Sequence, residues 1–196
     1  MFSTEAGRQA FADESFREAA LGGYYIIATV IFENATHHEV RAAMHELRGS
    51  RKTKKLHWHE MTAQEKHNAA KTVADLDGFH IVTVGSPVPA RRQERARALC
   101  LTGLVHELYS YEVSHLLMES RTPSLNERDV TTVRAARHQL PAGAVFHVEH
   151  VPGKSDALFW AADIIAGAVR SSREGLNDYR DLLAKRLYEI ELAIEC

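Results

Sequence analysis

Residues 157–169 read Ala-Leu-Phe-Trp-Ala-Ala-Asp-Ile-Ile-Ala-Gly-Ala-Val, a run in which Asp163 is the only charged residue. This pattern predicts a buried helix that Ser155 caps and that continues to about Val169. Its small residues would let the helix lie very close to a sheet. An ionised Asp163 on such a face loses several kcal/mol of hydration unless a cation or hydrogen-bond donors replace the water. The alternative is an aspartate that points outward at the rim of the helix.

The rest of the chain alternates between strand-like and helical patterns. Strands are predicted over Arg8–Asp13, Gly22–Glu33, Phe79–Val84, Val113–Met118 and Ala144–His150. Helices are predicted over Asn34–Gly49, Thr62–Gly78 (with Thr62 and Glu65 as a capping box), Arg91–Tyr111 and Val130–Leu140. Apolar residues at helical spacing also predict an amphipathic C-terminal helix over 176–196. We therefore expect one α/β domain over residues 1–196, with a central mixed sheet.

Composition excludes several classes of protein. The 196 residues carry 24 Lys and Arg against 26 Asp and Glu, a net charge of −2, which argues against coating nucleic acid by bulk charge but allows a local basic groove. The longest apolar run, Tyr24–Phe32, is too short to span a bilayer, so no membrane association is expected. Two cysteines, Cys100 and Cys196, cannot form a disulfide framework, and no secretory leader is recognisable. These features predict a cytoplasmic protein.

Two further acids stand at the ends of predicted strands. Asp13 lies in Phe11-Ala-Asp-Glu-Ser15, where alternation places it on the face of Phe11 and places Glu14 on the opposite face. Glu119 follows the apolar residues 116–118. Carboxylates at strand ends and on a packed helix can converge on a divalent cation, and Mg²⁺ and Mn²⁺ prefer such hard oxygen ligands. Each acid taken alone is more commonly a solvated loop residue.

The motifs and their order resemble a known family. Phe11-Ala-Asp-Glu-Ser15, a following strand with Gly22-Gly23, Leu56-His57 before a helix, and Ala162-Asp-Ile-Ile-Ala-Gly-Ala-Val169 are similar to the bacterial and phage family called domain of unknown function 3800. The resemblance covers roughly residues 8–170. It implies a ribonuclease H-like mixed central sheet with helices on both faces, and a carboxylate cluster that binds Mg²⁺ or Mn²⁺.

By position, the resemblance makes Asp13 the first-strand acid, Glu119 the acid that closes the fourth strand, and Asp163 the acid of the last family helix. The sequence departs from the family at three places. Phe16 stands where the family usually has Gly, Lys55 stands where an acid often precedes the family's His, and Trp160 or Ala161 replaces a polar residue. The three acids are intact, whereas the departures concern substrate preference.

Residues near His57 offer further chemistry. His57-Trp-His59-Glu60 has the spacing of some zinc sites, although no second His-rich motif accompanies it. We expect instead that His57 or Glu60 flanks the carboxylates and orients a water or a phosphate; surface histidines are the alternative. Basic residues over 48–55 and 91–97 could follow a phosphate backbone, with these weak candidates for nucleic-acid contact: Arg51, Lys52, Lys54 and Lys55.

The sequence thus predicts a metal-dependent phosphodiesterase that acts on RNA or DNA. In this hypothesis two cations, about 3.5–4 Å apart, activate water and stabilise the leaving oxygen. Asp13 would bridge the ions, Glu119 and Asp163 would complete their shells, and Glu14 or Glu60 would add a fourth oxygen. A non-catalytic phage or defence-system interaction protein with the same fold is the alternative. The predicted terminal helix would either cover the sheet or form a homodimer.

Overall fold

A mixed sheet forms the centre of the molecule. The computed structural model describes residues 8–19 and 22–194. Its strands are β1 (Arg8–Arg17), β2 (Tyr24–Phe32), β3 (Gly78–Ser86), β4 (Val113–Glu119), β5 (His147–Val151) and β6 (Leu187–Ala193). They lie in the order β5-β4-β1-β2-β3-β6. The β1–β2 and β2–β3 pairs are antiparallel and the other pairs are parallel.

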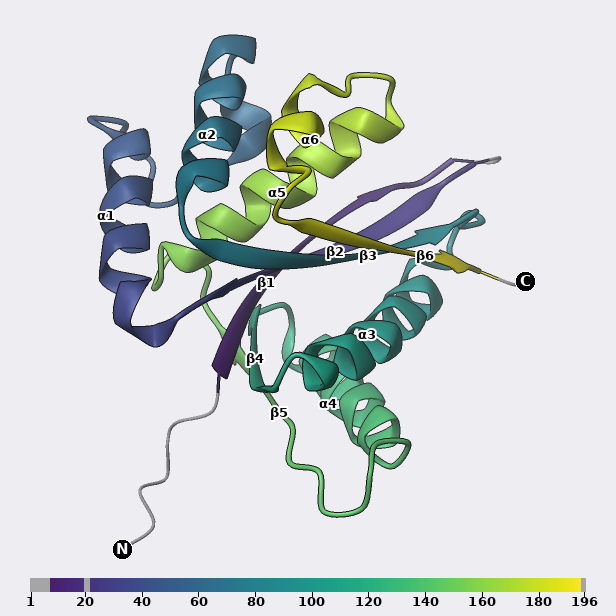
Figure 1. Cartoon of the computed structure of the whole chain (residues 1–196). Coiled ribbons are helices and arrows are strands. Elements are labelled where there is room, and N and C mark those ends of the chain that lie inside the picture. Colours follow the sequence, from purple (N-terminus) through teal and green to yellow (C-terminus); the bar gives the residue numbers. More distant parts are fainter. Residues whose placement is uncertain (1–7, 20–21, 195–196) are drawn as a thin grey trace, which may run out of the picture.

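Helices cover both faces of this sheet (Figure 1). One face carries α1 (His37–Arg48), α2 (Ala63–Asp75), α5 (Leu158–Arg173) and α6 (Asp178–Leu183). The other carries α3 (Gln93–Ser110) and α4 (Pro123–Arg137). Short 3-10 helices, η1 (Asn34–Thr36) and η2 (Trp58–Glu60), precede α1 and α2. Strand β2 is buried along its whole length because both helical layers pack on it. The predicted mixed α/β sheet with helices on both faces is confirmed.

Helix α5 is the buried helix that the small residues predict. A Cβ added at Gly167 would lie 2.2 Å from Trp58 Cγ, so the glycine is what lets η2 approach α5 this closely. The predicted cap is wrong, because α5 begins at Leu158 rather than directly after Ser155. Asp156 Oδ1 accepts the hydrogen bond from the Leu158 N–H at 3.0 Å, whereas the Ser155 hydroxyl donates to the Pro152 carbonyl. The capping box of Thr62 and Glu65 at the start of α2 is confirmed.

The predicted C-terminal helix over 176–196 is wrong. Helix α6 ends at Leu183, and residues 187–193 form β6, which pairs in parallel with β3. Ile190, Leu192 and Ile194 pack on the α3 side of the sheet, a spacing of two that belongs to a strand. The predicted homodimer relied on this helix and so loses its basis. Among the described residues, no helix has both the length and the apolar character for a bilayer crossing.

Candidate active site

Three acids from distant parts of the sequence line one cavity. Asp13 comes from β1, Glu119 ends β4 and Asp163 projects from α5 into a cavity of about 320 Å³. Ala12 of β1 pairs with Met118 of β4, so the next residue along each strand, Asp13 or Glu119, reaches the same edge of the sheet. Helix α5 crosses β1 and brings Asp163 to that edge. The acids that the sequence singled out are therefore gathered in one place.

A lysine lies between two of these acids. The Lys55 ammonium is 3.2 Å from Asp13 Oδ2 and also pairs with Glu119 Oε2. Only 10% of the Lys55 side chain is exposed. In this structure the Lys55 charge is directed into the acidic cavity, and its contact with a phosphate backbone stays a prediction.

Burial and crowding control the protonation of these groups. Burial and the neighbouring Asp163 raise the pKa of Asp13 from 3.8 to about 7, although Lys55 opposes the change. Burial also raises the pKa of Asp163. Burial disfavours the charge of Lys55, but Asp13 and Glu119 more than compensate and hold its pKa above the ordinary value. The cavity thus holds more carboxyl groups than the one ammonium paired with them, and the raised pKa values favour their protonated forms.

The backbone of η2 holds Asp163 in place. The Trp58 N–H donates to Asp163 Oδ2 at 2.8 Å, and the Trp58 ring packs beside Gly167 one turn further along α5. The Asp163 carboxylate therefore faces the cavity and η2 instead of pointing outward at a helix rim. This hydrogen bond opposes the effect of burial on its pKa.

The residues around His57 divide into two groups. His57 lines the acidic cavity, and burial together with the Lys55 charge lowers its pKa. Glu60 is exposed, does not line this cavity and lies 3.9 Å from His59, so the structure does not bring it to the acids. Within residues 8–19 and 22–194, no three His, Cys, Asp or Glu side chains are already arranged to hold a metal ion. Neither the histidines around His57 nor the acids of the cavity form a ready-made metal site.

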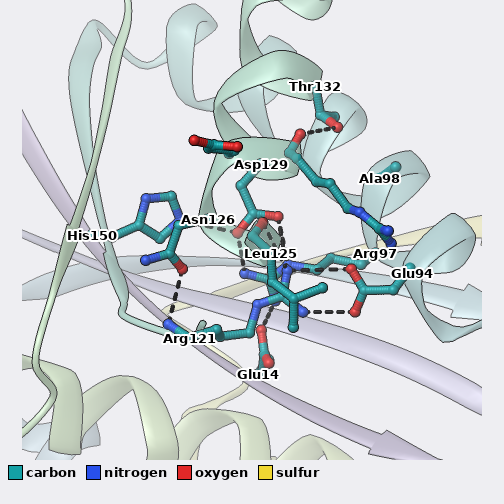
Figure 2. Close-up of polar contacts among 12 residues, drawn as sticks. Glu14, Glu94, Arg97, Ala98, Arg121, Leu125, Asn126, Asp129, Thr132 and His150 are labelled. Carbon is teal, nitrogen blue, oxygen red and sulfur yellow. Dashed lines mark hydrogen bonds and ion pairs between the residues drawn. The ribbon is translucent and has the colours of Figure 1, made fainter. Parts of the chain in front are cut away.

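Glu14 lines the acidic cavity as well, but its carboxylate is directed toward the α3 side of β1, as alternation predicts. Its carboxylate pairs with Arg97 of α3, which is almost fully buried. Arg97 also forms a two-point ion pair with Asp129 of α4, with both N–O distances at 2.8 Å, and donates to the Tyr25 hydroxyl. Arg121 joins Asp129 to Glu94, as Figure 2 shows.

The sequence does not predict this network. It suggests Glu14 as a metal ligand, but the Glu14 carboxylate is engaged by Arg97. Both arginines line the same cavity as the three acids. No local motif marks them, because the partners lie on different elements and meet only in the folded chain. His150 of β5 completes the network at 3.0 Å from Asp129 Oδ2.

The remaining basic candidates lie outside the acidic cavity. Arg51 pairs with Glu65 at the start of α2. Lys52 and Lys54 are exposed and contribute no atoms to the cavity lining. Whether they contact nucleic acid stays a prediction.

Solved structures share this architecture. The chain superposes on RNase HII from Archaeoglobus fulgidus, solved in a PCNA complex, with a TM-score of 0.53 and 17% identity over 90% of this chain and 76% of that chain. The fold is ribonuclease H-like. A second match is Bst-RNase HIII in complex with Mn²⁺, with a TM-score of 0.51 and 16% identity over 85% of this chain. This chain spans about half of that protein, 52% of its length.

The likeness to these proteins shows the fold alone, because the sequence identities are low. No family model and no curated protein sequence matches the chain. Membership of the domain of unknown function 3800 family therefore stays a prediction, whereas the ribonuclease H-like sheet that it implied is confirmed.

Proposed function

We propose that the protein is a divalent-metal-dependent nuclease that hydrolyses phosphodiester bonds of RNA or DNA at the acidic cavity. The observation that carries the proposal is the convergence of Asp13, Glu119 and Asp163 around that cavity. The fold adds support, since RNase HII and RNase HIII share it and the RNase HIII was solved with Mn²⁺. The resemblance to the domain of unknown function 3800 family is consistent with the same chemistry.

The donor set fits Mg²⁺ or Mn²⁺. Three carboxylates offer hard oxygen atoms, and two of them already bind a cation, the Lys55 ammonium. Asp13, Glu119 and Asp163 would hold the metal, and the pairing of Glu14 with Arg97 makes Glu14 a weaker candidate. When bound, the metal would supply an activated water and neutralise charge that develops on the phosphate.

The chain's own side chains and backbone would position the acids and the phosphate and would accept a proton from water. The Trp58 N–H fixes Asp163 through one oxygen and leaves Oδ1 for the cavity. His57 is held neutral at pH 7 by burial and by Lys55, which lower its pKa, so its ring can accept a proton from a water in the cavity. Arg121 is 15% exposed where it lines the cavity and can donate to phosphate oxygens. Arg97 also lines the cavity, but its guanidinium is engaged by Glu14 and Asp129.

Cleavage of end-labelled RNA, DNA and RNA–DNA hybrid strands tests the proposal. We expect the wild type to cleave at least one of them with Mg²⁺ or Mn²⁺ and not in chelator, and Asp163→Asn to lose about 10²-fold or more of that rate. Asp75→Asn is the matched control, since Asp75 is exposed and pairs with Lys71 on α2. Equal, metal-independent activity of wild type and Asp163→Asn would contradict the proposal.

A non-catalytic interaction protein is the second candidate. It is favoured by the ammonium between Asp13 and Glu119 and by the lack, in the part of the chain described, of a preformed metal cage. On this alternative the acidic cavity would be a structural ion-pair cluster. Strand cleavage that depends on Asp163 would exclude it.

A further inference from the structure

Lys55 differs from the basic residues around it. Lys52 and Lys54 are exposed, whereas the Lys55 side chain is nine-tenths buried and lines the acidic cavity. It belongs to a loop without helix or strand structure, and Leu56 and Trp58, one and three residues further on, are buried in the core. The loop is thus fixed immediately after Lys55, while the lysine itself has a long flexible stem.

The ammonium lies where a shared cation would have to lie. It contacts one oxygen of Asp13 and one of Glu119, and these carboxylates come from neighbouring parallel strands. Asp13 Oδ1 accepts a hydrogen bond from the Glu14 N–H at 2.8 Å, so the Asp13 oxygen open to a bridging divalent ion is Oδ2, which the ammonium contacts. An ammonium and a divalent ion that both contacted this acid pair would be only a few ångströms apart and would repel strongly in a partly buried site. The two cations therefore cannot occupy the acid pair together.

We propose that Lys55 is a resident cation that competes with the divalent ion for the Asp13–Glu119 pair. The ammonium stabilises the metal-free protein and must leave the pair before the ion enters. Metal affinity is therefore weaker than three carboxylates alone would give, and occupancy depends on the free metal concentration. This inference rests on the proposed metal site.

Isothermal titration of the full chain with Mn²⁺ tests it. Lys55→Gln removes the charge and keeps most of the side-chain length, and we expect it to bind Mn²⁺ about tenfold or more tightly than the wild type, which is roughly 1.4 kcal/mol. In chelator the variant should unfold at a lower temperature than the wild type, and Mn²⁺ should restore it. Lys55→Arg keeps the positive charge and should bind no more tightly than the wild type.

Lys54→Gln is the matched control. It makes the same change in net charge one residue away, on an exposed side chain. Its Mn²⁺ affinity should equal that of the wild type. If Lys54→Gln tightens binding as much as Lys55→Gln does, the effect is one of overall charge and the inference is wrong.

Two outcomes separate this inference from the proposed function. Tight Mn²⁺ binding by Lys55→Gln, with no binding and no cleavage by the wild type, supports the resident cation and contradicts the proposed nuclease. Metal-dependent cleavage by the wild type, with equal Mn²⁺ affinity in both proteins, supports the nuclease and contradicts competition by Lys55. If neither the wild type nor Lys55→Gln binds Mn²⁺, competition by Lys55 is also contradicted.

A measurement on the wild type covers the case in which Lys55→Gln does not fold. Trace acetylation of lysines, read by mass spectrometry, reports how accessible each ammonium is. Without metal, Lys55 should react several times more slowly than the exposed Lys54. Mn²⁺ should speed the acetylation of Lys55 several-fold and leave Lys54 unchanged. A Lys55 rate that Mn²⁺ does not raise would overturn the inference.

Discussion

The two faces of β1 carry acids in opposite states. On the α5 side, Asp13, Glu119 and Asp163 line the cavity with one ammonium, that of Lys55, which pairs with the first two. On the α3 side, three other carboxylates are matched by Arg97, Arg121 and His150. The chain therefore pairs every carboxylate of the second cluster with a cation, whereas the three acids of the first cluster have one paired ammonium among them, although Arg97 and Arg121 border the same cavity.

The protonation of the acids follows this difference. Burial raises the pKa of Asp13 to about 7. Burial acts in the same direction on Asp129, but hydrogen bonds from Arg97 and His150 overcome it and hold the pKa of Asp129 below its ordinary value. Carboxylates that are each paired with a cation contribute to folding. Buried carboxyl groups that outnumber their cations lower stability, and such a cluster indicates a ligand-binding site. Substitutions that alter one side and leave the other intact can separate these two roles.

Breaking the balanced side should have the largest effect. Arg97→Met leaves Glu14 and Asp129 without their buried partner, and loss of one member of a buried pair costs about 3–5 kcal/mol. We expect a fall of roughly 6–20 °C in the thermal midpoint by calorimetry. Arg95→Met, on the exposed side of the same helix, should change it little. A fall of the same size for Arg95→Met would refute the comparison.

The acid excess predicts an unusual dependence of stability on pH. Because the folded pKa of Asp13 is raised, its contribution to stability is complete below the unfolded value of 3.8 and is lost as pH rises through about 7. In chelator, the free energy of unfolding from urea titrations should therefore fall across this window by up to a few kcal/mol relative to Asp13→Asn.

Asp129 should behave in the opposite way. Its folded pKa is depressed, so its contribution is present above 3.8 and is lost as pH falls further. For Asp13, the contrary result is a free energy of unfolding that changes in parallel for the wild type and Asp13→Asn between pH 3.8 and about 7. It would show that the acid excess carries no energetic cost.

A smaller effect is expected from removing one charge of the excess. Asp163→Asn keeps the side-chain volume and an oxygen that can accept from the Trp58 N–H, while it relieves repulsion with Asp13. In chelator the variant should be as stable as the wild type or up to about 1 kcal/mol more stable. Mn²⁺ should raise the melting temperature of the wild type and hardly that of the variant. A variant that melts many degrees lower yet responds fully to Mn²⁺ would make Asp163 a structural acid.

We expect the smallest effect from two exposed lysines outside the acidic cavity, and it should be on nucleic-acid affinity. Replacing Lys52 and Lys54 together with Ala removes up to two phosphate-binding charges without touching the cavity. The slope of log affinity for nucleic acid against log salt should become shallower by about 0.7–0.9 for each phosphate that the variant no longer neutralises. An unchanged slope in fluorescence-anisotropy titrations would place the nucleic-acid interface elsewhere.

Local patterns predict most of the fold. The β-branched and aromatic residues of Tyr24–Phe32 indicate β2, and the small apolar residues around Asp163 indicate α5. The C-terminal strand escapes such patterns because its apolar residues fit both periods. Leu183, Leu187 and Ile190 follow a helix, whereas Ile190, Leu192 and Ile194 follow a strand. Pairing with the open edge of β3 decides between them, and that edge exists only in the folded chain.

Some residues of the candidate site can likewise be predicted from local sequence patterns, and others cannot. Asp13, Glu119 and Asp163 can be selected from the sequence because the first two stand at the ends of predicted strands and the third on an apolar helix face. The predicted end at Asp13 is wrong, because β1 continues to Arg17. Lys55 reads as part of a basic run, since nothing in residues 48–55 shows which of the side chains is buried. The Arg97 network cannot be predicted, because its members come from elements far apart in the chain.

An anomalous difference map of crystals grown with Mn²⁺ decides whether the acidic cavity is a metal site. We predict a manganese peak bounded by oxygen atoms of Asp13, Glu119 and Asp163, with the Lys55 side chain turned away from the acid pair. The Arg97–Asp129 pair on the other side of β1 should be unchanged. A map with no peak in the cavity, and with Lys55 still between Asp13 and Glu119, would contradict it.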